Sequence, residues 1–254
     1  MQIRFIRVPI MTNIYNHILK SKIENEKLLA ILLDPDKIDL DKAEILIEKI
    51  NQSPATHIFI GGSLVENNIL DELISKIRQF SPFGGRGALP IVLFPGNPSQ
   101  ISDKADAILF LSLISGRNSD YLIEHQVKAA PILKKTQLEI ISTGYILIES
   151  GTETAVERVS KTTPLDRNNP EYILQTAQAG ELLGNKLIYL EAGSGADIAV
   201  PREIIKKVSQ NIEIPLIVGG GIIDLQGIQK AYDSGADLVV IGTAFEKDVD
   251  FFNK

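Results

Sequence analysis

The stretch Leu187-Ile188-Tyr189-Leu190-Glu191-Ala192-Gly193-Ser194-Gly195 indicates most directly how this chain folds. It begins as a short apolar run, which is typical of a β-strand buried on both faces, and it ends in a glycine-rich turn. Glycine adopts backbone conformations that a Cβ atom blocks, and successive N–H groups in such a turn form a concave anion site. The stretch therefore predicts a buried strand whose end carries an anion site beside one carboxylate, that of Glu191.

Seven further apolar runs resemble this one, and sequence with helical spacing follows each of them. With 187–190, the predicted strands are 28–33, 57–60, 89–94, 107–112, 138–143, 215–218 and 238–241. The predicted helices are 14–26, 67–80, 121–135, 152–158, 170–183, 201–210 and 224–233. One more is expected to begin after Asp39 or Asp41 and to end at about residue 50, and 245–252 forms a short helix at most. Pro131 is expected to kink its helix or break its end, and the polar segment 160–169 is the best candidate for a mobile loop.

Eight strand–helix units in 254 residues match the size of one (β/α)8 barrel, a TIM barrel, formed by a single domain over 1–254. The alternative α/β fold, a doubly wound open sheet, would carry its glycine-rich loop early in the chain. Here the strongest glycine clusters are Gly193–Gly195, Gly219–Gly221 and Gly242–Thr243, which follow the last three predicted strands. The sequence therefore predicts a TIM barrel with a phosphate site at the carboxyl ends of strands six to eight.

Composition excludes several classes of function. The formal net charge of −6 is unlike that of nucleic-acid-binding domains, and the absence of cysteine excludes disulfides and thiolate chemistry. Three histidines make a histidine-rich zinc site improbable, whereas oxygen ligands for a hard cation such as Mg²⁺ are plentiful. No apolar run approaches the roughly 20 residues of a membrane span, and the N-terminus is too charged for a signal peptide. We expect a cytoplasmic protein.

Acids and hydroxyls follow the first two predicted strands. Asp34, within Asp34-Pro35-Asp36-Lys37, either caps a helical turn that Pro35 begins or holds Mg²⁺ together with phosphate oxygens. Ser63, at the end of the adjacent strand, would complete the metal ligands with its hydroxyl. Lys37 would either contact a phosphate or remain solvated.

Two anion sites on one rim favour a reaction that joins two phosphorylated substrates. Glu191 would then act as general base on a hydroxyl, while the metal neutralises a diphosphate leaving group. Other schemes stay open at this point. An isomerase or aldolase of sugar phosphates is one, although the predicted strand interiors contain no lysine for Schiff-base chemistry, and a non-catalytic phosphate-binding protein is another.

Five motifs carry a resemblance that covers nearly the whole chain. They are Leu33–Lys37, Gly61–Ser63, Tyr189–Gly195, Val218–Ile222 and Val240–Thr243. Together they resemble the geranylgeranylglyceryl phosphate synthase family, and Tyr189–Gly195 is the most specific of them. The segment 115–126 is similar to the branch of that family with a fuller helix.

The resemblance implies an Mg²⁺-dependent prenyltransferase. Such enzymes join the sn-3 hydroxyl of sn-glycerol 1-phosphate to geranylgeranyl diphosphate, or to a diphosphate of another length such as heptaprenyl, and release diphosphate. Asp34 and Ser63 match the metal positions, and Glu191 matches the residue that takes the hydroxyl proton. The implied sn-glycerol 1-phosphate residues are Tyr189, Leu190, Glu191, Ala192, Gly193, Ser194, Gly195, Gly220, Gly221, Gly242 and Thr243.

The prenyl chain of such a substrate requires an apolar groove. We expect the groove to cross the barrel top toward the fourth and fifth strand–helix units, with Tyr121, Tyr145 and Tyr172 as candidate lining residues. Relatives form dimers or larger rings, so a homo-oligomer is expected, and Ile123 and Val127 face either a partner or the barrel. The lipid product also suggests a transient contact with a membrane surface, without a transmembrane segment.

Overall fold

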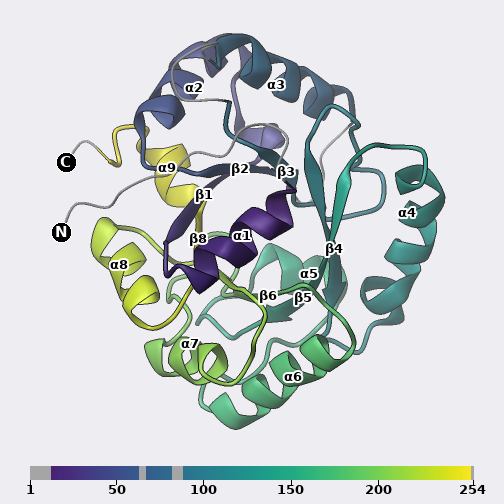
Figure 1. Ribbon diagram of the computed structural model, residues 1–254, viewed down its shortest axis with the longest axis vertical. Coiled ribbons are helices and arrows are strands. Elements are labelled where there is room, and N and C mark those ends of the chain that lie inside the picture. The colour runs from purple at the N-terminus through teal and green to yellow at the C-terminus, as the bar shows by residue number, and fades with distance from the viewer. Residues whose placement is uncertain (1–12, 63–66, 82–87, 253–254) are drawn as a thin grey trace.

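The computed structural model describes residues 13–62, 67–81 and 88–252. Within them, eight parallel strands form a closed barrel in sequence order, and β8 pairs with β1 to complete it (Figure 1). The strands are β1 (Leu28–Leu33), β2 (His57–Ile60), β3 (Ile91–Leu93), β4 (Ala107–Leu113), β5 (Glu139–Leu147), β6 (Leu187–Glu191), β7 (Leu216–Gly219) and β8 (Leu238–Ile241). The predicted (β/α)8 barrel is confirmed.

Helices surround the barrel because parallel neighbours need crossover connections (Figure 1). They are α1 (Ile14–Ile23), α2 (Ala43–Gln52), α3 (Asn67–Phe80), α4 (His125–Leu133), α5 (Ala155–Ser160), α6 (Pro170–Leu182), α7 (Arg202–Ser209), α8 (Leu225–Asp233) and α9 (Thr243–Lys247). Two 3₁₀ turns, η1 (Pro35–Lys37) and η2 (Leu40–Lys42), follow β1, and a π-helical turn, η3 (Asp120–Glu124), precedes α4. None of the helices in the described ranges is long and apolar enough to cross a membrane.

The two faces of each strand pack in different places. In β6, Leu187 and Tyr189 belong to the cluster inside the barrel, whereas Ile188 and Leu190 pack in the cluster between the barrel and its helices. Successive side chains of a strand point to opposite faces. Glu191 therefore follows Tyr189 inward, at the carboxyl end of the barrel.

Helix α1 covers the amino end of the barrel, as Figure 1 shows. Its residues Ile14 and Ile18 are buried in the inner cluster. The carboxylate of Glu139, at the start of β5, accepts the N–H groups of Ile14 at 2.5 Å and Tyr15 at 3.0 Å. This end of the barrel is thereby covered, and the site must lie at the other end.

Several element boundaries differ from the predicted ones. β5 continues four residues past its predicted end, because Ile146 and Leu147 pair with β6. β3 is shorter than predicted and begins after Pro90, which has no N–H to donate to a ladder. α9 begins two residues early and ends at Lys247. The predicted helix over 121–135 opens as the π turn η3, and α4 ends two residues beyond Pro131.

The segment 160–169 is anchored at its centre. Leu165 pairs with Ile148 as an isolated parallel bridge, with hydrogen bonds from Leu165 N–H to the Leu147 carbonyl and from Glu149 N–H to the Leu165 carbonyl, both of 2.9 Å. The expectation of a mobile loop did not foresee this attachment, because it requires the unpredicted extension of β5.

Candidate active site

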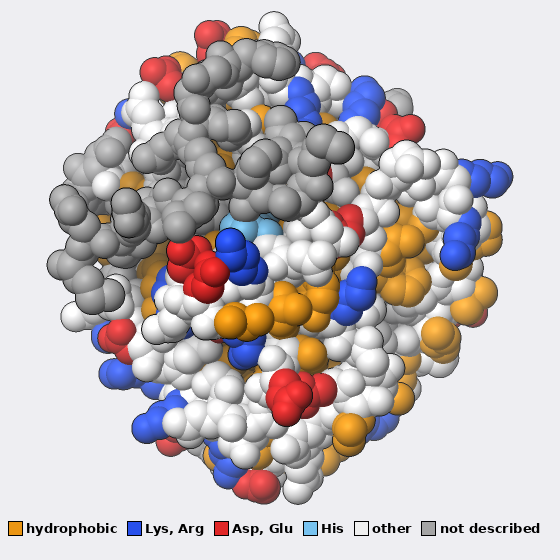
Figure 2. All heavy atoms as spheres, in the orientation of Figure 1, with side chains coloured by type: hydrophobic (Ala, Val, Ile, Leu, Met, Phe, Trp, Pro, Cys, Tyr) orange, Lys and Arg blue, Asp and Glu red, His pale blue; other side chains and the backbone are white. Residues whose placement is uncertain are grey.

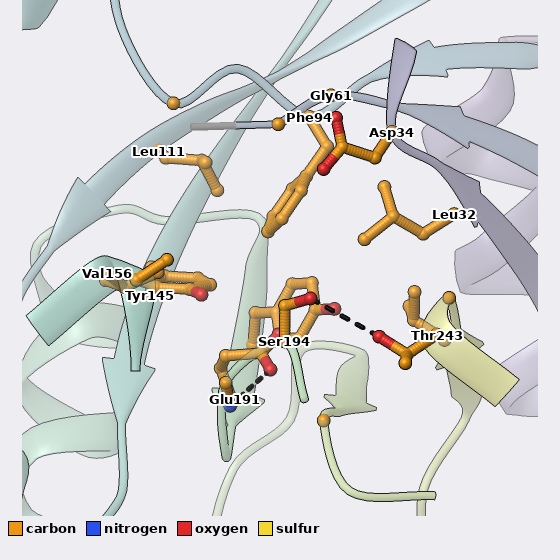
Figure 3. Close-up of a pocket in the computed structure, with 18 of the residues that line it drawn as sticks. Leu32, Asp34, Gly61, Phe94, Leu111, Tyr145, Val156, Glu191, Ser194 and Thr243 are labelled. Carbon is orange, nitrogen blue, oxygen red and sulfur yellow. Dashed lines mark hydrogen bonds between the residues drawn. The ribbon is translucent and has the colours of Figure 1, made fainter. Parts of the chain in front are cut away.

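A cavity of about 970 Å³ opens at the carboxyl ends of the strands. Its lining comes from the ends of β1 to β8. Residues 63–66, which follow β2, lie outside the described part of the chain. Figure 3 shows Asp34 and Glu191 on opposite sides of this cavity, with the ring of Phe94 projecting between them. The predicted convergence of strand ends therefore creates one site with two polar ends.

Glu191 forms one polar end and is almost fully buried, with 5% of its surface exposed. Its Oε1 accepts the Gly193 N–H at 2.6 Å. Burial raises the pKa of Glu191 to about 7, against the opposing effects of that N–H and of the nearby Tyr189 hydroxyl. This hydroxyl is buried and forms no hydrogen bond of regular geometry with a described residue. A carboxyl group with a pKa near 7 is suited to accept a proton at neutral pH.

A glycine cradle lies beside Glu191. In the described part of the chain, the N–H groups of Gly195, Gly220 and Gly221 donate to no backbone carbonyl, and all three residues line the cavity. Gly220 has φ +81°, and a Cβ there would lie 2.4 Å from Glu191 Oε1. Only glycine fits this position, which lets backbone donors approach a bound anion.

Ser194 and Thr243 close the cradle from two different loops. Their hydroxyl oxygens lie 3.4 Å apart, as the dashed line in Figure 3 marks, although the chain separates them by 49 residues. Both hydroxyls can donate to an anion oxygen. The cradle thus offers backbone and hydroxyl donors at one point, which is the arrangement expected of a phosphate site.

Most of the predicted glycerol-phosphate residues gather in the cavity, and two do not. The lining includes Tyr189, Glu191, Gly193, Ser194, Gly195, Gly220, Gly221, Gly242 and Thr243. Leu190 and Ala192 instead pack in the cluster between barrel and helices. The Ala192 N–H donates to the Gly219 carbonyl at 3.0 Å and is not available to a ligand. Strand alternation explains this placement, because these two side chains have the outward parity.

Asp34 forms the second polar end. Its Oδ1 accepts the Asp36 N–H at 3.2 Å, so Asp34 caps the turn η1. Capping was one of the two roles that the sequence predicted for it. Its Oδ2 lies 3.0 Å from the Lys37 ammonium, which also lies 3.4 Å from Glu246 Oε2. A Cβ on Gly62 would lie 2.3 Å from Asp34 Oδ1, so the glycine leaves room for the carboxylate. Capping therefore does not remove Asp34 from the cavity, which it still lines.

The donors at this end fit a magnesium ion bound chiefly by substrate. Asp34 and Glu246 both line the cavity and share one ammonium, and the described residues contain no group of three or more His, Asp or Glu able to hold a metal. Mg²⁺ typically takes one or two carboxylates together with phosphate oxygens and water. Ser63, the second predicted metal ligand, lies outside the described residues.

An apolar wall joins the two polar ends to the fourth and fifth strand–helix units. The rings of Phe94 and Tyr189 stack with their centroids 5.4 Å apart, and Tyr145 lies 5.3 Å from Tyr189. Beyond them the lining includes Phe110, Leu111, Leu113, Tyr121, Ala129, Val156 and Val159. Tyr121 and Tyr145 line the cavity as expected. Tyr172 does not: it is on α6, where its hydroxyl accepts a hydrogen bond from Arg117 at 3.0 Å.

Several residues that line the cavity escaped the sequence analysis, among them Phe94, Val156 and Glu246. Phe94 ends the third strand run, and Val156 lies on α5, where helical spacing alone does not show which face meets the barrel mouth. Glu246 follows the eighth strand by five residues. An acid placed just after strand eight was a detectable signal, because strand eight neighbours strand one and its Asp34 in a closed barrel.

Comparison with known proteins identifies the family. The family model described as "PcrB family" matches residues 21–253. The chain belongs to the PcrB family. Because the match spans nearly the whole barrel, it includes both polar ends of the site and the apolar wall.

Relatives of this PcrB family member carry a consistent name. A protein of Flavobacterium johnsoniae named geranylgeranylglyceryl phosphate synthase is 67% identical and covers 96% of this chain and 98% of its own. One of the same name from Zunongwangia profunda is 49% identical, covering 93% and 98%. The resemblance predicted from the sequence is confirmed, as is the prediction of an enzyme of this class.

A solved structure gives the same result. The geranylgeranylglyceryl phosphate synthase of Thermoplasma acidophilum, in complex with its substrate sn-glycerol-1-phosphate, is 32% identical and superposes with a TM-score of 0.88. The alignment covers 96% of this chain and 95% of that one. The PcrB family barrel described here therefore has the fold of a synthase that binds a glycerol phosphate.

Proposed function

We propose that this enzyme joins the sn-3 hydroxyl of sn-glycerol 1-phosphate to C1 of geranylgeranyl diphosphate. The bond between C1 and the diphosphate oxygen breaks, an ether bond forms to C1, the hydroxyl proton passes to Glu191, and diphosphate leaves. The observation that carries the proposal is the placement of the Glu191 carboxylate beside the glycine cradle, across the cavity from Asp34. The names of the relatives and the substrate in the Thermoplasma acidophilum structure support it.

The glycine cradle would hold the phosphate and leave the other end of the glycerol for Glu191. An acid beside a phosphate is otherwise unfavourable, because the carboxylate repels the anion. A three-carbon glycerol separates the two charges and brings a hydroxyl to the carboxylate. The raised pKa of Glu191 suits the acceptance of that proton.

Asp34, with Ser63, would hold Mg²⁺ at the opposite end of the cavity. When bound, Mg²⁺ neutralises charge on the leaving diphosphate. Asp34 is sheltered, with 18% of its side chain exposed, and is oriented by the Asp36 N–H. The apolar wall through Leu111 and Val156 would cover the prenyl chain and exclude water from the allylic cation that develops at C1.

The test is the release of diphosphate from geranylgeranyl diphosphate, with and without sn-glycerol 1-phosphate and Mg²⁺. Release that needs both additions is the expected result. Release without the glycerol phosphate would contradict the proposal, and so would turnover that is unchanged by removing Mg²⁺ with a chelator. A series of prenyl diphosphates, including heptaprenyl diphosphate, on the same preparation tests the alternative of another chain length.

We also propose that the enzyme is a homo-oligomer. Figure 2 shows apolar side chains gathered at the edge of the molecule where α4 lies. There, Ile123 is 58% exposed and Val127 is 56% exposed, so both face away from the barrel. Light scattering on the wild-type protein and on Val127→Glu tests this, with a fall to monomer mass in the variant as the expected result.

A further inference from the structure

One ammonium lies between two carboxylates at the mouth of the cavity. Lys37 Nζ is 3.0 Å from Asp34 Oδ2 and 3.4 Å from Glu246 Oε2. The carboxylates are sheltered, at 18% and 15% exposure, whereas the lysine side chain is 49% exposed. Partial burial lowers the pKa of Lys37, but its bonds to the two acids outweigh that effect and raise it above its usual value. The lysine is therefore charged, and about half of its side chain is exposed.

The three residues meet only because the barrel closes. Asp34 and Lys37 are three residues apart on the turn η1, so their contact is local. Glu246 is 209 residues further along, in the first turn of α9. The pairing of β8 with β1 places that turn beside η1. An acid in a first helical turn is ordinary. Among the described salt bridges, however, Glu246 and Asp34 share one partner, the Lys37 ammonium.

The next turn of the chain repeats the local pattern without the third residue. Asp39 caps η2 and lies 2.8 Å from the Lys42 ammonium, again three residues later. This pair is largely exposed, and neither residue lines the cavity. The Asp39–Lys42 pair can therefore stabilise its own turn but does not contribute to the cavity, whereas Asp34 and Lys37 both line it.

We propose that Lys37 binds the diphosphate of the prenyl substrate, and that Glu246 is the positioning residue that keeps the Lys37 ammonium at the cavity mouth. This inference rests on the proposed function. The Lys37 ammonium lies 3.0 Å from Asp34 Oδ2, so a divalent cation bound at Asp34 would repel it and weaken this ion pair. Diphosphate oxygens offer the displaced ammonium a new partner, and Glu246 holds it close enough to reach them. Lys37 then adds positive charge where the leaving group becomes more negative.

The first test is binding of inorganic pyrophosphate in the presence of Mg²⁺, measured by calorimetry. We expect Lys37→Met to weaken binding about tenfold or more, the usual effect of removing a charged hydrogen bond. Lys37→Arg, which keeps the charge, should recover most of the affinity. Lys42→Met, the matched control from η2, should bind as the wild type does, and the affinity for sn-glycerol 1-phosphate should be unchanged in all three variants.

The second test addresses Glu246. Glu246→Gln should weaken pyrophosphate binding about 3- to 10-fold, which corresponds to the lower part of the range of coupling energies between neighbouring side chains. It should raise the KM for the prenyl diphosphate more than it lowers kcat, and in the Lys37→Met background it should have no further effect on binding.

Three results would overturn the inference. One is normal Mg²⁺-dependent pyrophosphate binding by Lys37→Met, which would mean that Lys37 only stabilises the turn η1 through its ion pair with Asp34. Another is an equal loss of sn-glycerol 1-phosphate affinity, which would indicate general damage. The third is additive effects of Lys37→Met and Glu246→Gln. A wild-type protein that neither binds pyrophosphate nor releases it from a prenyl diphosphate would overturn the proposed function as well. If the wild type is active and the variants bind pyrophosphate as it does, only this inference is contradicted.

Discussion

Glu191 is held where its charge is disfavoured. Its position above Tyr189 follows from strand alternation, and the end of the barrel buries it beside two aromatic rings. Burial raises its pKa to about 7 although the Gly193 N–H favours the charged form. The same burial that makes this carboxyl group a useful proton acceptor should therefore reduce the stability of the fold above neutral pH.

The acid limb of the activity profile should report Glu191. In the proposed mechanism the unprotonated carboxylate is the base, so we expect kcat/KM for the prenyl transfer to fall as the pH drops below about 7. Glu191→Gln should lower kcat by about 10²- to 10⁴-fold, the usual contribution of a general base, and should abolish this limb. Glu157→Gln, on α5 and outside the cavity lining, serves as the control. Near-normal turnover by Glu191→Gln would refute the assignment of the base.

Stability should change in the opposite direction. The folded-state pKa of about 7 lies above the usual value of 4.5, so the contribution of this group is fully present below pH 4.5 and is lost as the pH rises through 7. Glu191→Gln stays neutral at every pH. We expect its free energy of unfolding to match that of the wild type near pH 4.5 and to exceed it at pH 8 by up to about 3 kcal/mol. Urea unfolding at both pH values measures this, and a variant less stable at pH 8 would contradict it.

At the scale of elements, the turn after β2 shapes the turn after β1. Asp34 caps η1 through the Asp36 N–H, and its carboxylate occupies the space that a side chain at position 62 would take. Neighbouring strand ends of a barrel are close enough for one turn to determine the geometry of the next. The glycine after β2 is thus part of the proposed diphosphate end of the site although it offers no side chain.

Gly62→Ala should damage that end alone. The added Cβ would lie 2.3 Å from Asp34 Oδ1, so the carboxylate must move. We expect affinity for pyrophosphate with Mg²⁺ to fall about 10- to 100-fold, as when the support of a metal ligand is lost. Affinity for sn-glycerol 1-phosphate, measured by the same calorimetry, should stay within about twofold, since the cradle lies across the cavity. Equal losses at both ends would contradict this division of the site.

At the scale of the molecule, the apolar wall is assembled from the ends of β3 to β5 and from α4 and α5. Figure 3 shows Val156, Leu111 and Tyr145 at the same side of the cavity. If the prenyl chain crosses here, the space between these elements determines the length that the enzyme accepts.

A larger side chain at Val156 should therefore shorten the preferred substrate. We expect Val156→Trp to lower kcat/KM for geranylgeranyl diphosphate about tenfold or more, because overpacking costs roughly 1–3 kcal/mol, while geranyl diphosphate is spared. Ile45→Trp, on the exposed face of α2, is the control for the bulk of the indole. Equal losses for both chain lengths would place the prenyl chain elsewhere.

The sequence by itself determined the order of the eight strands, the barrel and most of the residues that form the glycine cradle. Continuous apolar runs and glycine turns are local signals, and they placed Glu191 at the end of the sixth strand beside the glycine turn. The limits of that information are visible in Leu190 and Ala192. In the structure, strand alternation turns their side chains outward, whereas the family motif contains them without regard to direction.

Only the tertiary structure decided what depends on contacts across the barrel. Closure of β8 onto β1 joined Glu246 to Lys37, pairing with β6 extended β5, and packing of α6 turned Tyr172 away from the cavity. The raised pKa of Glu191 is of the same kind, because it is set by the atoms that exclude water from the carboxylate. Such effects act through space between residues far apart in the chain, so no local pattern carries them.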